Sequence, residues 1–193
     1  MKSETIHWQT KKGKSQRSNV ISLQERQAAT LGPQRTQQLA WDIAASVLDP
    51  EVPAVTVAEL GILRHVEITD NGHVIAQLTP TYSGCPAVLA IENLVQEALE
   101  AAGYSVTIER VLSPAWTTDW ITDEGLAKLK AYGIAPPAKV SNHKRSLFSN
   151  PSVACPACDS FETTLISEFG STACKAHYQC KSCNEPFDYF KCL

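Results

Sequence analysis

The chain has 193 residues, of which 44% are hydrophobic and 19% are charged, a composition typical of one folded domain with a small appendage and not of a disordered chain. Its longest uncharged stretch, residues 74–91, contains polar residues and two prolines, which excludes a transmembrane helix. The net charge is +5 over residues 1–38 and −9 over residues 39–137, and an acidic core disfavours nucleic acid as a partner.

Residues 1–38 are polar and basic, and no apolar run follows them. They therefore predict a disordered leader and not a secretory signal, so we expect a cytoplasmic protein with no membrane partner. The chain has seven cysteines, and an odd number in a reducing compartment favours metal binding or thiol chemistry over disulfides.

The first predicted helix covers residues 35–48, where apolar residues recur at helical spacing until Asp49 and Pro50 stop the run. Two prolines then predict an extended loop over residues 49–54. Residues 62–69 and 73–78 are β-prone runs joined by Asp-Asn-Gly, which tolerates positive φ and favours a hairpin.

A second amphipathic helix is expected after Pro86, and Gly103 is expected to end it. Residues 104–112 predict a third strand, and residues 122–132 a third helix. The order α-β-β-α-β-α predicts a compact α/β domain over residues 39–137.

A proline-flanked basic stretch, residues 138–151, predicts a linker to a cysteine-rich module over residues 152–193. This module contains two Cys-x-x-Cys pairs separated by 21 residues, and two such turns facing each other make a four-sulfur metal cage. The predicted ligands are Cys155, Cys158, Cys180 and Cys183. The spacing favours a zinc ribbon that needs its metal to fold, although an iron–sulfur cluster also uses four cysteines.

Cys174 and Cys192 remain outside these two pairs. They could be buried thiols, extra metal ligands together with His177, or a disulfide formed on oxidation. His177 has no second histidine at metal-binding spacing, so we interpret it as an ordinary strand residue.

Cys85 stands alone, directly before Pro86, a residue that suits the first position of a helix. We expect Cys85 at the helix N-cap, where the helix dipole would lower its pKa and favour metal binding or nucleophilic reactions. The alternative is a small buried thiol. Asp49 and Glu51 join Cys85 in this candidate site if the two loops lie at the same end of the sheet, and are otherwise solvent-exposed loop residues.

Several runs resemble one known family, namely LDPEVPAVTVAELGILRHVEI, TPTYSGCPA, SPAWTTDWIT and the six-cysteine tail. They are similar to the PaaD (PaaJ) family, the D subunits of the bacterial phenylacetyl-CoA epoxidase system. Residues 39–137 also resemble the wider family of metal–sulfur cluster assembly proteins. The resemblance covers about residues 39–193 and leaves the leader outside it.

The resemblance implies an accessory factor that assists iron–sulfur or metal-centre assembly in the epoxidase complex, with the oxygenase and reductase subunits as partners. It also implies handling of a metal or a transient iron–sulfur cluster at Asp49, Glu51 and Cys85. The residues agree with a non-catalytic subunit, because the chain has neither the Glu-x-x-His helices of a di-iron oxygenase nor a G-x-G-x-x-G dinucleotide turn.

Two other functions remain open at this point. The ribbon cysteines could serve a thiol oxidoreductase that cycles between dithiol and disulfide. The ribbon could also bind nucleic acid, although residues 146–193 contain no arginine and the module is net acidic.

Overall fold

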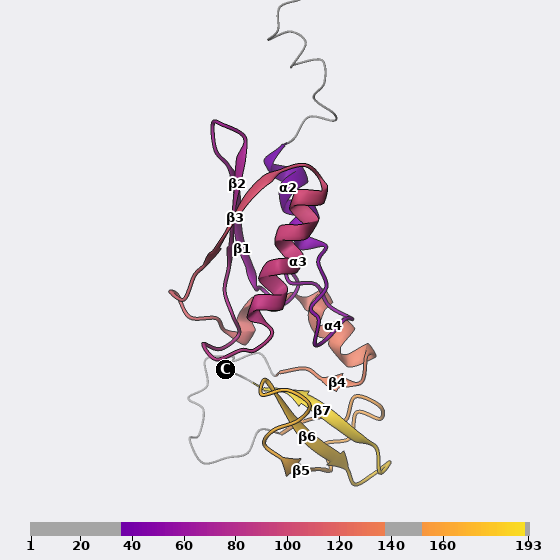
Figure 1. Cartoon of the computed structure of the whole chain (residues 1–193). Helices are drawn as coiled ribbons and strands as arrows, with labels where there is room; N and C mark the ends of the chain where they lie inside the picture. Colours follow the sequence, from indigo (N-terminus) through magenta and orange to yellow (C-terminus); the bar gives the residue numbers. More distant parts are fainter. Residues whose placement is uncertain (1–35, 138–151, 192–193) are drawn as a thin grey trace, which may run out of the picture. The chain divides into compact units, whose positions relative to one another are not determined.

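The computed structural model describes residues 36–137 and 152–191, here called the first module and the ribbon (Figure 1). The first module has a sheet in the order β1-β2-β3, with β1 (Leu63–Ile68), β2 (His73–Leu78) and β3 (Ser105–Arg110). β1 and β2 form the predicted antiparallel hairpin, and Gly72 in its turn has φ +79°. β2 and β3 are parallel.

Two helices pack on this sheet, as Figure 1 shows: α2 (Gln37–Ala45) contacts β1, and α3 (Val88–Ala101) contacts β3 and α2. The buried face of α3 consists of Ile91, Val95 and Leu99, spaced four residues apart. These side chains meet the alternate buried residues of β2, so the core lies between the helices and the sheet.

The short 3₁₀ helix η1 (Thr118–Trp120) and α4 (Asp123–Ala131) complete the first module. Thr122 caps α4 by accepting a hydrogen bond from the Gly125 N–H, and Gly133 with φ +90° follows the helix. The predicted α-β-β-α-β-α order and the ribbon are therefore confirmed. The linker and the leader lie outside the described residues, so the predicted domain boundaries stay predictions.

The ribbon sheet has the order β4-β7-β6-β5, with β5 (Thr163–Ser167), β6 (Lys175–Cys180) and β7 (Pro186–Phe190) antiparallel in sequence. The short strand β4 (Ile134–Ala135) follows α4 and pairs in parallel with β7. No pattern in the sequence anticipated β4. Through it, the first module supplies one strand of the ribbon sheet.

The two modules also exchange buried side chains. Ala135 packs among the buried residues of the ribbon, while Cys174 and Phe190 belong to the core of the first module. Phe190 is 2% exposed, and its ring lies 6.3 Å from that of Trp116. The aromatic residues of β7 are buried, as expected for strand packing and not for stacking on bases.

Two helix limits differ from the sequence expectations. α2 ends at Ala45, three residues early, because the Ser46 hydroxyl donates a hydrogen bond to the Ile43 carbonyl and Leu48 then bridges to Thr56. α3 begins at Val88 and not at Pro86. Within the described residues, none of the helices is both long and apolar enough to cross a membrane.

Candidate functional site

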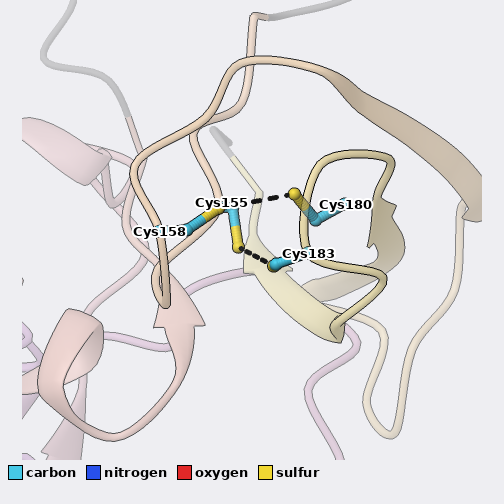
Figure 2. A group of neighbouring side chains, drawn as sticks. All are labelled: Cys155, Cys158, Cys180 and Cys183. Carbon is cyan, nitrogen blue, oxygen red and sulfur yellow. Dashed lines mark hydrogen bonds between the residues drawn. The ribbon is translucent and has the colours of Figure 1, made fainter.

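The four cysteines of the two Cys-x-x-Cys pairs converge in the ribbon (Figure 2). All four sulfurs lie within 4.8 Å of one another. The Sγ atoms of Cys155 and Cys183 are 3.7 Å apart, and those of Cys158 and Cys180 are 3.6 Å apart. Zn–S bonds of about 2.3 Å in a tetrahedron separate two sulfurs by about 3.8 Å. The cysteine cluster therefore fits one tetrahedral metal ion.

Backbone geometry shapes both cysteine turns in the same way. The residue after each second cysteine, Asp159 or Asn184, has a left-handed φ of 58° or 64°. Each first cysteine donates its N–H across the turn, Cys155 to the Ser160 carbonyl and Cys180 to the Glu185 carbonyl, both at 2.9 Å. Asp and Asn tolerate this conformation better than most residues, which explains their position there.

Backbone amides also favour thiolates in this cluster. The Cys183 N–H, with help from the Ser182 N–H, lowers the pKa of Cys180 to about 6. The pKa of Cys158 rises to about 12 despite the Ser160 N–H, because the neighbouring thiols and burial outweigh that hydrogen bond. Deprotonation thus starts at one sulfur, and a bound cation would favour loss of the remaining protons.

The remaining ribbon candidates lie apart from this cluster. Cys174 is 6% exposed in the core of the first module, with its Sγ 3.0 Å from the Thr172 hydroxyl. His177 lies on β6, as interpreted from the sequence, with its Nδ1 3.2 Å from an Asp188 carboxylate oxygen. Cys192 lies outside the described residues.

A second group of reactive side chains surrounds a small cavity of about 20 Å³. Asp49, Glu51 and Cys85, the three residues grouped together from the sequence, all line it, and so does Cys174. Asp49 is 6% exposed, and its Oδ1 accepts hydrogen bonds of 2.8 Å from the Glu51 and Val52 amides. This turn points the Asp49 carboxylate inward, where a solvent-exposed loop residue would face water.

Burial dominates the electrostatics of this second group. It raises the pKa of Asp49 despite the two amide bonds, and together with the Asp49 charge it raises the pKa of Glu51. The pKa of Cys85 is also raised, by burial and then by Glu51 and Asp49, although the Ala87 amide opposes this.

The expectation of a lowered pKa at Cys85 is therefore wrong. The N-cap of α3 is Ala87, two residues after Cys85. Cys85 instead belongs to the preceding turn, where its amide donates to the Tyr82 carbonyl and its own carbonyl accepts from Val88. Because it lies before the helix, the dipole does not outweigh desolvation.

Two residues at this cavity were missed from the sequence as neighbours of Cys85, namely Cys174 and Lys175. Lys175 is 4% exposed, its Nζ lies 3.9 Å from Asp188 Oδ2, and its charge acts to lower the pKa of both Asp49 and Glu51. No local spacing signals either residue, because their placement depends on how the ribbon packs against the first module.

Comparisons with known proteins match both modules. Residues 139–191 match the PaaD zinc beta ribbon domain, and residues 42–109 match a family described as iron-sulfur cluster assembly protein. The second range contains Asp49, Glu51 and Cys85, while the first contains Cys174 and the four cage cysteines.

An Escherichia coli K12 protein, which its name gives as the D component of a 1,2-phenylacetyl-CoA epoxidase, is 48% identical over 166 residues, covering 86% of this chain and 98% of that protein. A Porphyromonas gingivalis W83 protein named as an Fe-S protein maturation auxiliary factor is 31% identical over 86 residues, covering 44% of this chain and 81% of its own. A solved Bacillus anthracis domain of unknown function, DUF59, has 22% identity and a TM-score of 0.45, covering 48% of this chain and 90% of its own. The chain therefore belongs to the PaaD family, whose Escherichia coli member it matches along almost that protein's whole length.

Proposed function

We propose that this chain is an accessory maturation factor of a phenylacetyl-CoA epoxidase complex, and that it assists assembly of an iron–sulfur or other metal centre there. The relatives' names support an accessory role in maturation. The observation that carries the proposal is the convergence of Asp49, Glu51 and Cys85 on one cavity, inside the segment that matches iron–sulfur cluster assembly proteins.

These three side chains suit transient handling of iron. A thiolate binds soft and borderline metals, whereas carboxylates bind harder ions, so a mixed set can hold a cation without the closed shell of a structural site. The Asp49 turn fixes one carboxylate beside the cavity. The half-buried Cys85 can still be reached from outside, which a donor of metal to another protein requires.

The ribbon cage has a different role in this proposal, that of a structural zinc site. Four cysteine ligands leave no open coordination position, and closed four-sulfur sites are typical of zinc that stabilises a fold. The ribbon is a small sheet with a small buried cluster, so its folding would depend on the metal. Its sheet also includes β4 of the first module, which fits a docking or supporting element.

The two alternative functions have less support. Nucleic-acid binding would need exposed basic and aromatic side chains, but Phe187, Tyr189 and Phe190 are each at most 4% exposed. A thiol oxidoreductase would need the ribbon cysteines free to form disulfides, whereas their spacing matches a tetrahedral metal shell.

The proposal is tested in a strain that lacks this chain and expresses the remaining epoxidase subunits. The strain is complemented with the wild-type chain, with Cys85→Ala, or with Ser83→Ala, an exposed change in the same loop. We expect wild type and Ser83→Ala to restore epoxidation and Cys85→Ala to fail while accumulating as a folded protein. Full epoxidation with Cys85→Ala would refute the role of Cys85.

A further inference from the structure

One point of the ribbon, just before β6, is built into the core of the first module. The Cys174 carbonyl accepts a 2.9 Å hydrogen bond from the Lys191 amide, which ties the start of β6 to the end of β7. Cys174 and Phe190 lie in the core of the first module, while most other buried ribbon residues form a separate cluster. The ribbon thus holds the Cys174 thiol in a fixed place.

That place is the cavity of the candidate site. Cys174 and Cys85 line it together with Asp49 and Glu51, and the rest of the wall is mainly apolar, with Phe190 among the residues that close it. A cavity of about 20 Å³ has room for one water-sized ligand and not for an assembled iron–sulfur cluster. Two thiols and two carboxylates therefore surround the space of a single ion.

The charges at this cavity favour a cation. All four of these groups become anionic when they ionise, and burial raises the pKa of each, so in the absence of a cation their charged forms are disfavoured. The buried Lys175 contributes one positive charge that acts on Asp49, Glu51 and Cys174, and its own nearest carboxylate is Asp188, 3.9 Å away. One lysine does not balance four potential anions.

We propose that Cys174 from the ribbon joins Cys85 in a two-thiol site, completed by the carboxylates of Asp49 and Glu51, for a single divalent cation of the Fe²⁺, Co²⁺ and Zn²⁺ class. This inference rests on the proposed function and deepens it, because it names the cargo as one ion and adds a ligand from the other module. Each thiol that binds the ion releases its proton to solvent.

This second site differs from the ribbon cage in how tightly it is organised. Among residues 36–137 and 152–191, the cage cysteines form the group whose ligand atoms all lie within 4.8 Å of one another. The side chains at the second site are more widely spaced and must turn toward an ion to bind it. We therefore expect weaker and faster exchange at the second site than at the cage, as a carrier of cargo requires.

The test titrates Co²⁺ anaerobically into the full chain after the ribbon has been loaded with one equivalent of Zn²⁺. Thiolate-to-cobalt charge-transfer absorption reports sulfur ligands at the second site. The variants are Cys85→Ser, Cys174→Ala and the control Ser171→Ala, an exposed change three residues from Cys174. Retained zinc and an intact thermal transition show that each variant is folded.

We expect wild type and Ser171→Ala to bind a second ion with charge-transfer absorption. Cys174→Ala should lose about half of that absorption and weaken binding at least about tenfold, because even outer-shell changes at metal sites cost that much. Wild-type absorption and affinity in Cys174→Ala, with loss in Cys85→Ser, would overturn this inference and leave the proposed function standing. Binding unaffected by either variant would overturn both.

A measurement on the wild-type chain removes any dependence on the variants' folding. With ¹¹³Cd²⁺ in both sites, NMR should give two resonances, one in the range of four sulfur ligands and one in the range of mixed sulfur and oxygen ligands. A single four-sulfur resonance, or a second one typical of oxygen ligands only, would overturn the inference.

Discussion

The exchange of buried residues between the modules can be tested with two phenylalanines of β7. Phe190 is 2% exposed in the core of the first module, whereas Phe187 is 4% exposed in the ribbon's own cluster. The two substitutions, Phe190→Ala and Phe187→Ala, remove the same side chain from the same strand. The structure predicts that only the first weakens the first module directly.

Replacing a fully buried phenylalanine by alanine costs about 3–5 kcal/mol, from lost burial and the cavity that remains. Phe190→Ala also removes the ring contact with Trp116 at 6.3 Å. Since domains are stable by about 5–15 kcal/mol, this loss is a large fraction of the total. Phe187→Ala should instead weaken the ribbon, which a bound metal supports with roughly 10–16 kcal/mol of apparent binding free energy.

The assay is hydrogen exchange of the metal-loaded protein, followed by mass spectrometry, on peptides from α3. Each 1.4 kcal/mol changes an equilibrium constant about tenfold, so Phe190→Ala should speed exchange in α3 by at least about a hundredfold. Phe187→Ala should leave α3 close to wild type. Unchanged exchange of α3 in Phe190→Ala would refute the docking of the ribbon on the first module.

Three further outcomes follow from the site geometry. Cys180→Ser should abolish stoichiometric metal binding at the cage and unfold the ribbon, measured by metal analysis and circular dichroism; full metal content would show that Cys180 is not a ligand. In the metal-free protein, burial and the nearby carboxylates raise the pKa of Cys85, so its alkylation at pH 7.5 should be slower than that of a free thiol and should accelerate up to a higher pH; fast alkylation at pH 7.5 would contradict this. Burial raises the pKa of Glu59, but hydrogen bonds from Lys128 and Thr56 outweigh it and lower it overall, so its contribution to stability is present above the unfolded pKa and lost as pH falls through the folded one; Lys128→Met should flatten this acid dependence in urea unfolding, and an unchanged slope would contradict it.

Local sequence signals explain the parts of the fold that were predicted well. The Asp-Asn-Gly turn placed the hairpin, and the predicted limits of β2 match the observed strand. The two Cys-x-x-Cys spacings likewise anticipated which four sulfurs come together. In each case, the residues that determine the geometry lie within a few positions of one another, so the pattern can be recognised without the rest of the chain.

The parts that were missed depend on contacts between distant segments. β4 has only two residues, and it forms by pairing with β7 more than fifty positions later. Cys174 shares its neighbourhood in the sequence with the cage cysteines, yet packing of the ribbon places it beside Cys85. The pKa of Cys85 was predicted in the wrong direction because Pro86 precedes the helix by two residues and burial outweighs the dipole.

The most direct test of the account is the iron and acid-labile sulfide content of the epoxidase complex, purified anaerobically from a strain that lacks this chain. We predict normal amounts of the oxygenase and reductase proteins with a clear deficit of iron or sulfide, restored by the wild-type chain and not by Cys85→Ala. An epoxidase with full iron and sulfide content and full activity in the deletion strain would contradict a role in maturation.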